Sequence, residues 1–232
     1  MLAEAQAAEL VVSRLYAAPR GVLRVTTPAA FGHLHIAPAI PEFLARYPEL
    51  SVQIVMNDRI VDLVEEGYDI AIRMSREHAP NTVARRLAPV RWAVCAAPSY
   101  LARHGTPRAP RELARHNCLF YSFLESSAEW RFSSPAGEEA VRVAGNFTVN
   151  NSEALREAAL RGLGIALLPT FAVGGELREG RLQRLLAGYR AHGTFGPEVY
   201  AVYLPTRYLS PKVRAFIDFF VERFGPEPYW EK

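Results

Sequence analysis

Short apolar runs alternate with helical patterns in the first third of the chain, and this alternation constrains the fold more than any other feature. We expect strands at 21–27, 50–56 and 68–74, with helices at 28–47 and 59–66 between them. Pro48 and Gly67 follow the two expected helices and end them. The order β-α-β-α-β predicts a mostly parallel sheet with helices on its faces.

A second set of α/β elements begins at about Ala96. After strands at 83–87 and 91–96, we expect a helix at 98–104, strands near 119, at 130–132 and at 140–143, a helix at 152–161, a strand at 164–168 and a short helix from 170. The 164–168 run is apolar throughout, which is typical of a strand buried on both faces. A strand at 199–204 and a helix at 210–224 complete the chain. The sequence thus predicts an α/β fold with two lobes.

Composition fits this organisation. The chain has 232 residues, of which 50% are hydrophobic and 22% are charged, as in globular proteins large enough for two lobes. The net charge is +3 and the arginines are scattered, which argues against a nucleic-acid surface. No apolar run reaches the roughly 18 to 20 residues of a membrane helix, and the N-terminus lacks the pattern of a secretory signal, so we expect a cytoplasmic protein. Cys95 and Cys118 are expected to be buried free thiols.

Several sequence blocks, taken in order, resemble the effector-binding domain of LysR-type transcriptional regulators. They are GVLRVTTPAAFG (21–32), APAIPEFLARYP (37–48), VDLVEEGYDIAIR (61–73), APSYLARHG (97–105), NNSEAL (150–155), GLGIALLP (162–169) and SPKVRAFIDF (210–219). The resemblance covers residues from about Gly21 to Phe224, and the joint order and spacing of the blocks carry it.

The resemblance implies a fold like that of the type 2 periplasmic binding proteins. In this fold two α/β lobes are joined by two crossover strands, with a ligand cleft between them. The crossovers would fall near Val94–Ala97 and near Tyr200–Leu204. We expect residues 1–20 to be the end of a linker helix, 21–95 and 203–232 to form lobe I, and 96–202 to form lobe II.

Candidate ligand contacts follow from the rule that open α/β sheets bind ligands beyond the carboxyl ends of their strands. In lobe I they are Thr26, Thr27, Pro28, Phe31, Arg73 and Met74, and in lobe II Asn150, Asn151, Ser152, Pro169 and Thr170. In the family, the position of Thr26 and Thr27 commonly places a hydroxyl on the effector. Thr27 and Asn150–Ser152 also stand before helices, whose free amide groups suit an anion, so we expect a carboxylate or phosphate ligand.

Structural roles compete with ligand binding at three of these places. Asn150–Ser152 also form a helix N-cap cluster, and both roles can hold together. Phe31 is also typical of a core position. Arg73 either faces an acidic ligand or pairs with a carboxylate such as Asp58.

The resemblance also implies partners. LysR-type regulators begin with a winged helix-turn-helix that binds DNA, and no such segment precedes Gly21, so we expect DNA contact only through a domain absent from this chain. The family pairs its effector domains, which predicts a homodimer of this fragment and up to a tetramer of the full-length protein. A small-molecule effector is the expected ligand. We expect no cofactor, no metal and no membrane partner.

Two other function classes are less well supported. An enzyme would need converging catalytic groups, but the sequence has no G-x-S-x-G, and His33 and His35 point in different directions on the expected helix. We therefore expect no catalytic residues. A solute-binding protein of a transporter shares the fold, but the missing signal sequence and the linker-like first helix argue against it.

Overall fold

The computed structural model describes residues 18–75, 79–122, 128–206 and 208–232. The helix expected at 2–18 lies outside these residues, apart from Ala18. The chain divides into two compact units. Unit 1 contains the described residues up to Ala88 together with Glu198–Pro226, and unit 2 contains Pro89–Pro197 together with Glu227–Lys232. The chain therefore passes from one unit to the other three times, whereas the resemblance implies two crossovers. The sequence-based division places all of 203–232 in lobe I, but residues 227–232 pack within unit 2.

Unit 1 is built on a five-stranded sheet with the order β2-β1-β3-β13-β4. Its strands are β1 (Gly21–Thr27), β2 (Leu50–Met56), β3 (Ile70–Arg73), β4 (Val83–Pro89) and β13 (Glu198–Tyr203). Strand β1 is parallel to both β2 and β3, whereas β13 is antiparallel to β3. The first three strands thus form the parallel sheet that the alternation predicts. Strand β13 joins them from far along the sequence.

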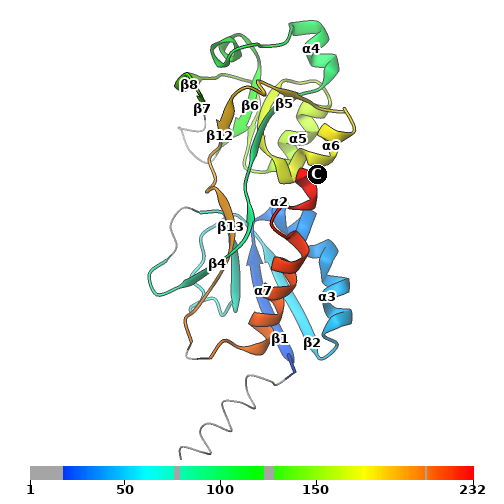
Figure 1. The fold of residues 1–232 in the computed structure, drawn as a ribbon, viewed down its shortest axis with the longest axis vertical. Coiled ribbons are helices and arrows are strands. Elements are labelled where there is room, and N and C mark those ends of the chain that lie inside the picture. Colours follow the sequence, from blue (N-terminus) through cyan, green and yellow to red (C-terminus); the bar gives the residue numbers. More distant parts are fainter. Residues whose placement is uncertain (1–17, 76–78, 123–127, 207) are drawn as a thin grey trace, which may run out of the picture. The chain divides into compact units, whose positions relative to one another are not determined.

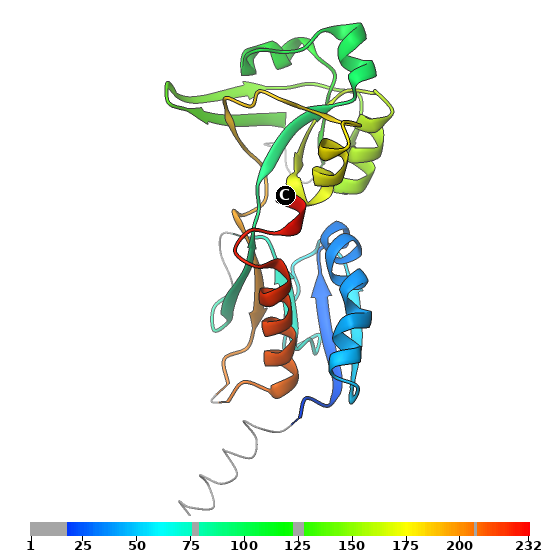
Figure 2. The same ribbon diagram turned by 45° about the vertical axis from the view of Figure 1, so that its right-hand side comes forward.

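Two helical segments run alongside β1 and β2 (Figures 1 and 2). One consists of α2 (Ala29–Phe31), η1 (Gly32–Ile36), η2 (Ala37–Ala39) and α3 (Ile40–Arg46), and the other is α7 (Pro211–Phe224). The Phe43 ring of α3 lies 5.6 Å from Phe216 and 5.3 Å from Phe219 of α7, measured between centroids, and these contacts join the two segments. The first segment changes from α to π and 3-10 geometry because Pro38 and Pro41 lack the N–H that a regular α-helix needs there.

The helix predicted at 59–66 is wrong. Residues 63–67 form turns instead, and residues 59–62 form no regular element. The Asp62 side chain accepts hydrogen bonds from the backbone of Val64 at 2.8 Å and of Glu65 at 3.0 Å. An aspartate that bonds its own neighbouring backbone offers an alternative to helical hydrogen bonding, and here that alternative prevails.

Unit 2 contains two sheets, with the orders β11-β5-β10-β6-β9 and β12-β7-β8. The strands are β5 (Trp92–Ala96), β6 (Cys118–Tyr121), β7 (Glu129–Ser134), β8 (Gly137–Arg142), β9 (Thr148–Val149), β10 (Ile165–Pro169), β11 (Gln183–Leu185) and β12 (Arg190–His192). The helices are α4 (Pro98–His104), η3 (Pro110–Arg115), α5 (Ser152–Leu160), α6 (Thr170–Arg178) and η5 (Tyr229–Glu231). Strand β10 is the central strand, and all five of its residues are buried, which confirms the prediction for this apolar run.

Candidate functional site

In unit 1, three strands bring their carboxyl ends to one edge of the sheet. The register sets Thr27 of β1 opposite Met56 of β2, and Thr26 of β1 opposite Ala71 of β3. Because all three strands run in the same direction, the residues that end or follow them share this edge. Thr26, Thr27 and Arg73 of the predicted site therefore lie close together, and Asn57, a strand end that is not among the predicted contacts, joins them.

Three polar atoms at this edge are buried but unpaired. Within the described part of the chain, Thr26 Oγ1, Asn57 Oδ1 and Arg73 Nη2 have no hydrogen-bond partner. Thr26 is completely buried. An unsatisfied buried polar group costs about 1–3 kcal/mol, so three of them on neighbouring strand ends make this edge the candidate site of unit 1.

Arg73 carries the only charge among these three groups. Its Nη1 donates to the carbonyl oxygen of Ile72 at 3.0 Å. Burial lowers the pKa of Arg73, and the nearby Asp58 carboxylate partly opposes this effect. Asp58 instead accepts a hydrogen bond from the backbone N–H of Ala29 at 3.2 Å. Of the two roles left open for Arg73, the described residues thus do not show the ion pair with Asp58.

The other predicted residues of unit 1 shape this edge. Gly32 lies so close to Thr27 that a Cβ on it would fall 2.4 Å from Thr27 Cγ2, which explains why a glycine stands there. Phe31 is fully buried, and its ring contacts those of His35 and Phe224 at 5.1 and 5.9 Å, as expected of a core residue. Pro28 and Met74 are half-buried beside them.

In unit 2, the predicted site residues are already satisfied by other protein groups. The Asn151 side chain caps α5 by accepting from Glu153 N at 2.9 Å and Ala154 N at 3.0 Å. The buried Ser152 hydroxyl is 2.8 Å from the Tyr121 hydroxyl. Asn150, next to them, is exposed. Within this cluster, Asn151 therefore acts as the N-cap of α5.

The start of α6 is satisfied in the same way. Thr170 follows Pro169, the last residue of β10, and its N–H donates to the Arg91 carbonyl at 2.8 Å. Its hydroxyl hydrogen-bonds the Glu231 carboxylate and lies 3.2 Å from the same Arg91 carbonyl. Thr170 is almost completely buried.

Sequence reasoning missed an aromatic cluster that adjoins Ser152. The rings of Trp92, Tyr121 and Phe195 contact one another, with centroid separations of 5.2 Å for both pairs that include Phe195 and 6.2 Å for the third pair. Tyr121 ends β6, and no sequence pattern links Trp92 to Phe195. The role of the residues named in the sequence analysis as ligand contacts stays a prediction.

Other chemistry has little support in the described residues. They contain no group of three side chains able to hold a metal ion. Ser133 Oγ lies 2.8 Å from His192 Nε2, but this bond joins neighbouring strands, and within the described residues no carboxylate completes a catalytic triad. No described helix is long and apolar enough to cross a membrane. Cys95 and Cys118 are buried free thiols, as predicted, and burial raises the pKa of each to about 12.

A surface pocket of about 480 Å³ lies elsewhere in unit 2. Its lining residues are Pro98, Leu177, Arg178, Gly180, Leu182, Gln183 and Arg184. None of them belongs to the predicted ligand contacts, and the pocket sits at the last turn of α6 rather than at its start. This pocket is therefore separate from the strand ends described above.

Comparison with known proteins identifies the family. The LysR substrate binding domain family matches residues 17–225. The transcriptional regulator CrgA of Neisseria meningitidis is 34% identical over 225 residues, which is 97% of this chain and 74% of CrgA. PtxR, a transcriptional regulator of Pseudomonas aeruginosa, is 32% identical over 231 residues, which is 99% of this chain and 72% of PtxR.

A solved structure agrees with these matches. The regulatory domain of CrgA from Neisseria meningitidis, a LysR-type transcriptional regulator, superposes with a TM-score of 0.80 at 34% identity, covering 89% of this chain and all of that domain. The mixed α/β sheets of the two units fit the type 2 periplasmic-binding-protein-like architecture that the resemblance implies. The chain belongs to the LysR-type transcriptional regulators, as a domain of the family that binds the effector.

Proposed function

We propose that this domain senses a small anionic metabolite, and that the strand ends of unit 1 supply the main contacts to its acidic group. The observation that carries the proposal is the set of unmade hydrogen bonds at Thr26, Asn57 and Arg73. A carboxylate or phosphate accepts hydrogen bonds from a guanidinium and a hydroxyl, and these charge-assisted bonds are about twice as strong as neutral ones. The unpaired atom of Asn57 is Oδ1, which accepts, so Asn57 would bond a donor group of the metabolite rather than its acidic group.

Unit 2 has a secondary role in this proposal. Asn150, Asn151, Ser152, Pro169 and Thr170 offer polar groups, but Asn151, Ser152 and Thr170 already bond other protein groups. A ligand would have to exchange with these bonds, so the net gain from unit 2 is smaller. Thr27, Pro28, Phe31 and Met74 set the shape of the edge in unit 1. These assignments predict that affinity depends more on unit 1 than on unit 2.

The proposed mechanism is a population shift. An effector that binds one arrangement of the units better than another moves the equilibrium toward the favoured arrangement. In a paired, full-length regulator, this shift would change the spacing of the DNA-binding domains. An effector with equal affinity for both arrangements would change nothing, however tightly it binds.

A thermal-shift screen tests the proposal directly. The panel contains small carboxylates, aromatic acids, amino acids and phosphorylated metabolites, and each hit is recovered afterwards. A ligand at about 100 times its Kd adds about 2.7 kcal/mol to the free energy of unfolding. We expect hits that are recovered unchanged and whose effect is lost in Thr26→Val and Arg73→Met. Hits that bind equally well to both variants would contradict the assignment to unit 1, and hits recovered as products would overturn the sensor function.

A further inference from the structure

The last residues of the chain form a separate attachment to unit 2. Helix α7 belongs to unit 1 and ends at Phe224, and residues 227–232 belong to unit 2. Only Gly225 and Pro226 lie between them. Two residues span at most about 7 Å when fully extended, so this connection is short, and the proline makes it stiff. It is the third of the three passages between the units, and no strand of the three sheets takes part in it.

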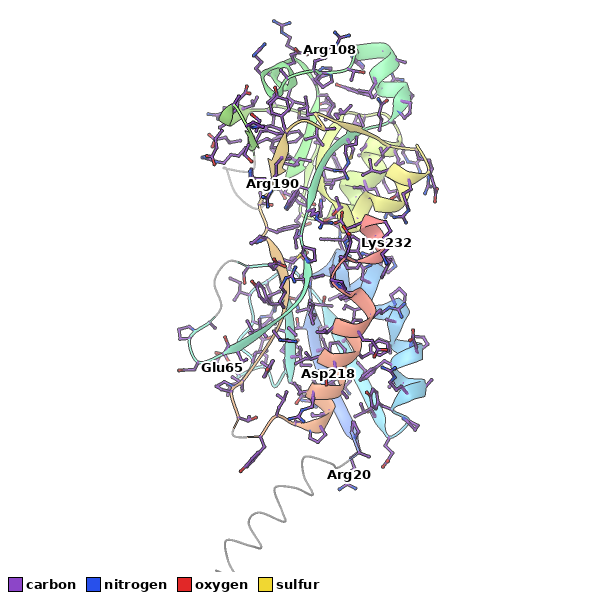
Figure 3. The ribbon with its side chains drawn as sticks, viewed as in Figure 1. Arg20, Glu65, Arg108, Arg190, Asp218 and Lys232 are labelled. Carbon is purple, nitrogen blue, oxygen red and sulfur yellow. The ribbon has the colours of Figure 1, made fainter. Side chains whose placement is uncertain are left out.

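The tail is anchored along α6 by close backbone contacts. Figures 1 and 3 show the C-terminus beside this helix, where Lys232 is labelled. The Trp230 side chain is buried, and the Arg178 guanidinium donates to the carbonyl oxygens of Trp230 at 3.3 Å and Lys232 at 2.8 Å. A Cβ on Gly174 would lie 2.2 Å from the Trp230 oxygen, so the tail reaches this position only because residue 174 is a glycine.

A buried carboxylate fixes the tail at the other end of α6. Glu231 accepts a hydrogen bond from the Thr170 hydroxyl and lies 3.3 Å from Arg91 Nη1. Its side chain is only 7% exposed, in contrast with the 57% of Glu227, the other carboxylate that pairs with Arg91. Thr170 is the first residue of α6, where the helix dipole favours a negative charge. The chain thus supplies its own anion to the start of this helix.

We propose that residues 227–232, which bind α6 within unit 2 and follow α7 of unit 1 after only two residues, are a latch that limits the rearrangement available to the two units. Two strand crossovers alone leave hinge and twist motions between such units, and a third short connection restrains them. The regulatory meaning of the latch rests on the proposed function, because the latch would resist or bias the shift that an effector produces. The restraint itself is present without any effector.

The test compares two neighbouring glycines of α6 in the full chain. Gly174→Ala places a Cβ against the tail backbone, whereas a Cβ at Gly175 meets nothing within 4 Å. Both changes replace glycine by alanine in the same helix, so their effects on helix propensity match. Spin labels on Asp218→Cys in unit 1 and Arg108→Cys in unit 2, both exposed, report the distance between units by pulsed electron paramagnetic resonance (Figure 3). The two native cysteines are buried, with thiol pKa values raised to about 12, so they stay unlabelled.

Without any ligand, we expect a broader distance distribution in Gly174→Ala and an unchanged one in Gly175→Ala. Glu231→Gln keeps the side-chain shape, removes the charge that pairs with Arg91 and should broaden the distribution as well, while Glu138→Gln, at an exposed position of unit 2 outside the tail, should not. This second pair serves as the test if Gly174→Ala does not fold. Identical distributions in each variant and its control would overturn the latch. Because no effector enters this measurement, failure of the ligand screen and failure of the latch remain distinct results.

Discussion

The two units treat the polar groups at their strand ends in opposite ways. In unit 1, Thr26, Asn57 and Arg73 are packed into the fold with bonding atoms unused among the described residues. In unit 2, Asn151 caps a helix and Thr170 bonds the chain's own C-terminal tail. Both sets of residues follow the same rule for ligand sites in α/β sheets, yet only one set is left unsatisfied. The location of a polar residue at a strand end therefore makes it a candidate ligand contact. The candidates whose hydrogen bonds are unmade are the stronger ones.

The difference follows from the local helices. Helix α5 is nine residues long and starts with an asparagine, which is well suited to accept from its first amides. The helical segment of unit 1 starts after a proline, which offers no side-chain cap. Asp58 caps that segment from the end of a different strand, at Ala29. The carboxylate that was one of the two possible partners of Arg73 is thus bonded elsewhere, and Arg73 Nη2 remains available.

The largest expected effect is at Arg73. Arg73→Met removes the charge that would bind an acidic ligand, and a hydrogen bond to a charged group is worth about 1.5–3 kcal/mol. We expect the affinity for any anionic hit of the screen to fall about 10- to 100-fold, measured by titration calorimetry. Arg214→Met, an exposed arginine of the same unit, is the control for net charge. Equal affinities in the two variants would mean that Arg73 does not bind the acidic group, and the strand ends of unit 1 would no longer differ from those of unit 2.

In unit 2, we expect substitution of a site residue to lower the stability of the domain rather than its affinity for a ligand. Asn151→Ala deletes the two bonds that cap α5, and loss of an N-cap typically costs about 1 kcal/mol. Asn150→Ala changes the exposed neighbour and should stay within about 0.5 kcal/mol of the wild type. Urea unfolding of the free domain measures both. If the two variants lose the same free energy of unfolding, the side-chain cap of α5 does not account for the role of Asn151 in unit 2.

Local patterns were sufficient to predict most of the fold. The apolar run of β10 and the parallel strands β1 to β3 follow from the sequence, as do the bounds of α4, α5 and α7 to within about one residue. The turn at 59–66 was missed because apolar spacing favoured a helix, whereas the Asp62 side chain bonds to the backbone there. The packing of residues 227–232 on unit 2 was also missed, since a six-residue tail has no periodicity, and its anchor depends on Gly174, more than 50 residues earlier.

Side-chain hydrogen bonding at the site was much less predictable. Strand ends identify Thr26 and Arg73, but sequence alone cannot say that Asp58 bonds Ala29 and that Arg73 Nη2 has no partner among the described residues. Asn57 is visible in the sequence as the end of the second strand, but the sequence does not show that its Oδ1 is buried and unpaired among the described residues. Likewise, the bond from Thr170 to Glu231 joins residues 61 positions apart. Such pairings depend on tertiary packing, which periodicity does not encode.

A change at Thr26 should have the opposite sign to the change at Asn151. Thr26→Val keeps the volume and removes a buried hydroxyl with no partner among the described residues. Since an unsatisfied buried polar group is unfavourable, we expect the free domain to gain about 1 kcal/mol while losing affinity for anionic hits. Thr148→Val, at an exposed strand position, should change neither quantity appreciably. A destabilised Thr26→Val domain would mean that the hydroxyl is bonded, and unit 1 would then resemble unit 2.

The smallest effect is a pH dependence that originates in unit 2. Burial, with a further contribution from His104, lowers the pKa of His116, whose Nδ1 lies 3.3 Å from the Tyr100 hydroxyl. Because the folded-state pKa is below the unfolded value of about 6.5, the unfolded chain binds more protons as the pH falls below that value, and stability decreases until the pH is below the folded pKa. His116 is partly exposed, so the loss should be less than about 1 kcal/mol. Urea unfolding of the wild type and of His116→Gln is measured at pH 7.5 and at pH 5. The contribution of His116 is the part of the stability loss between these pH values that the variant lacks. If wild type and variant lose the same stability between these pH values, the titration belongs to other groups, and the pH sensitivity of the domain does not distinguish unit 2 from unit 1.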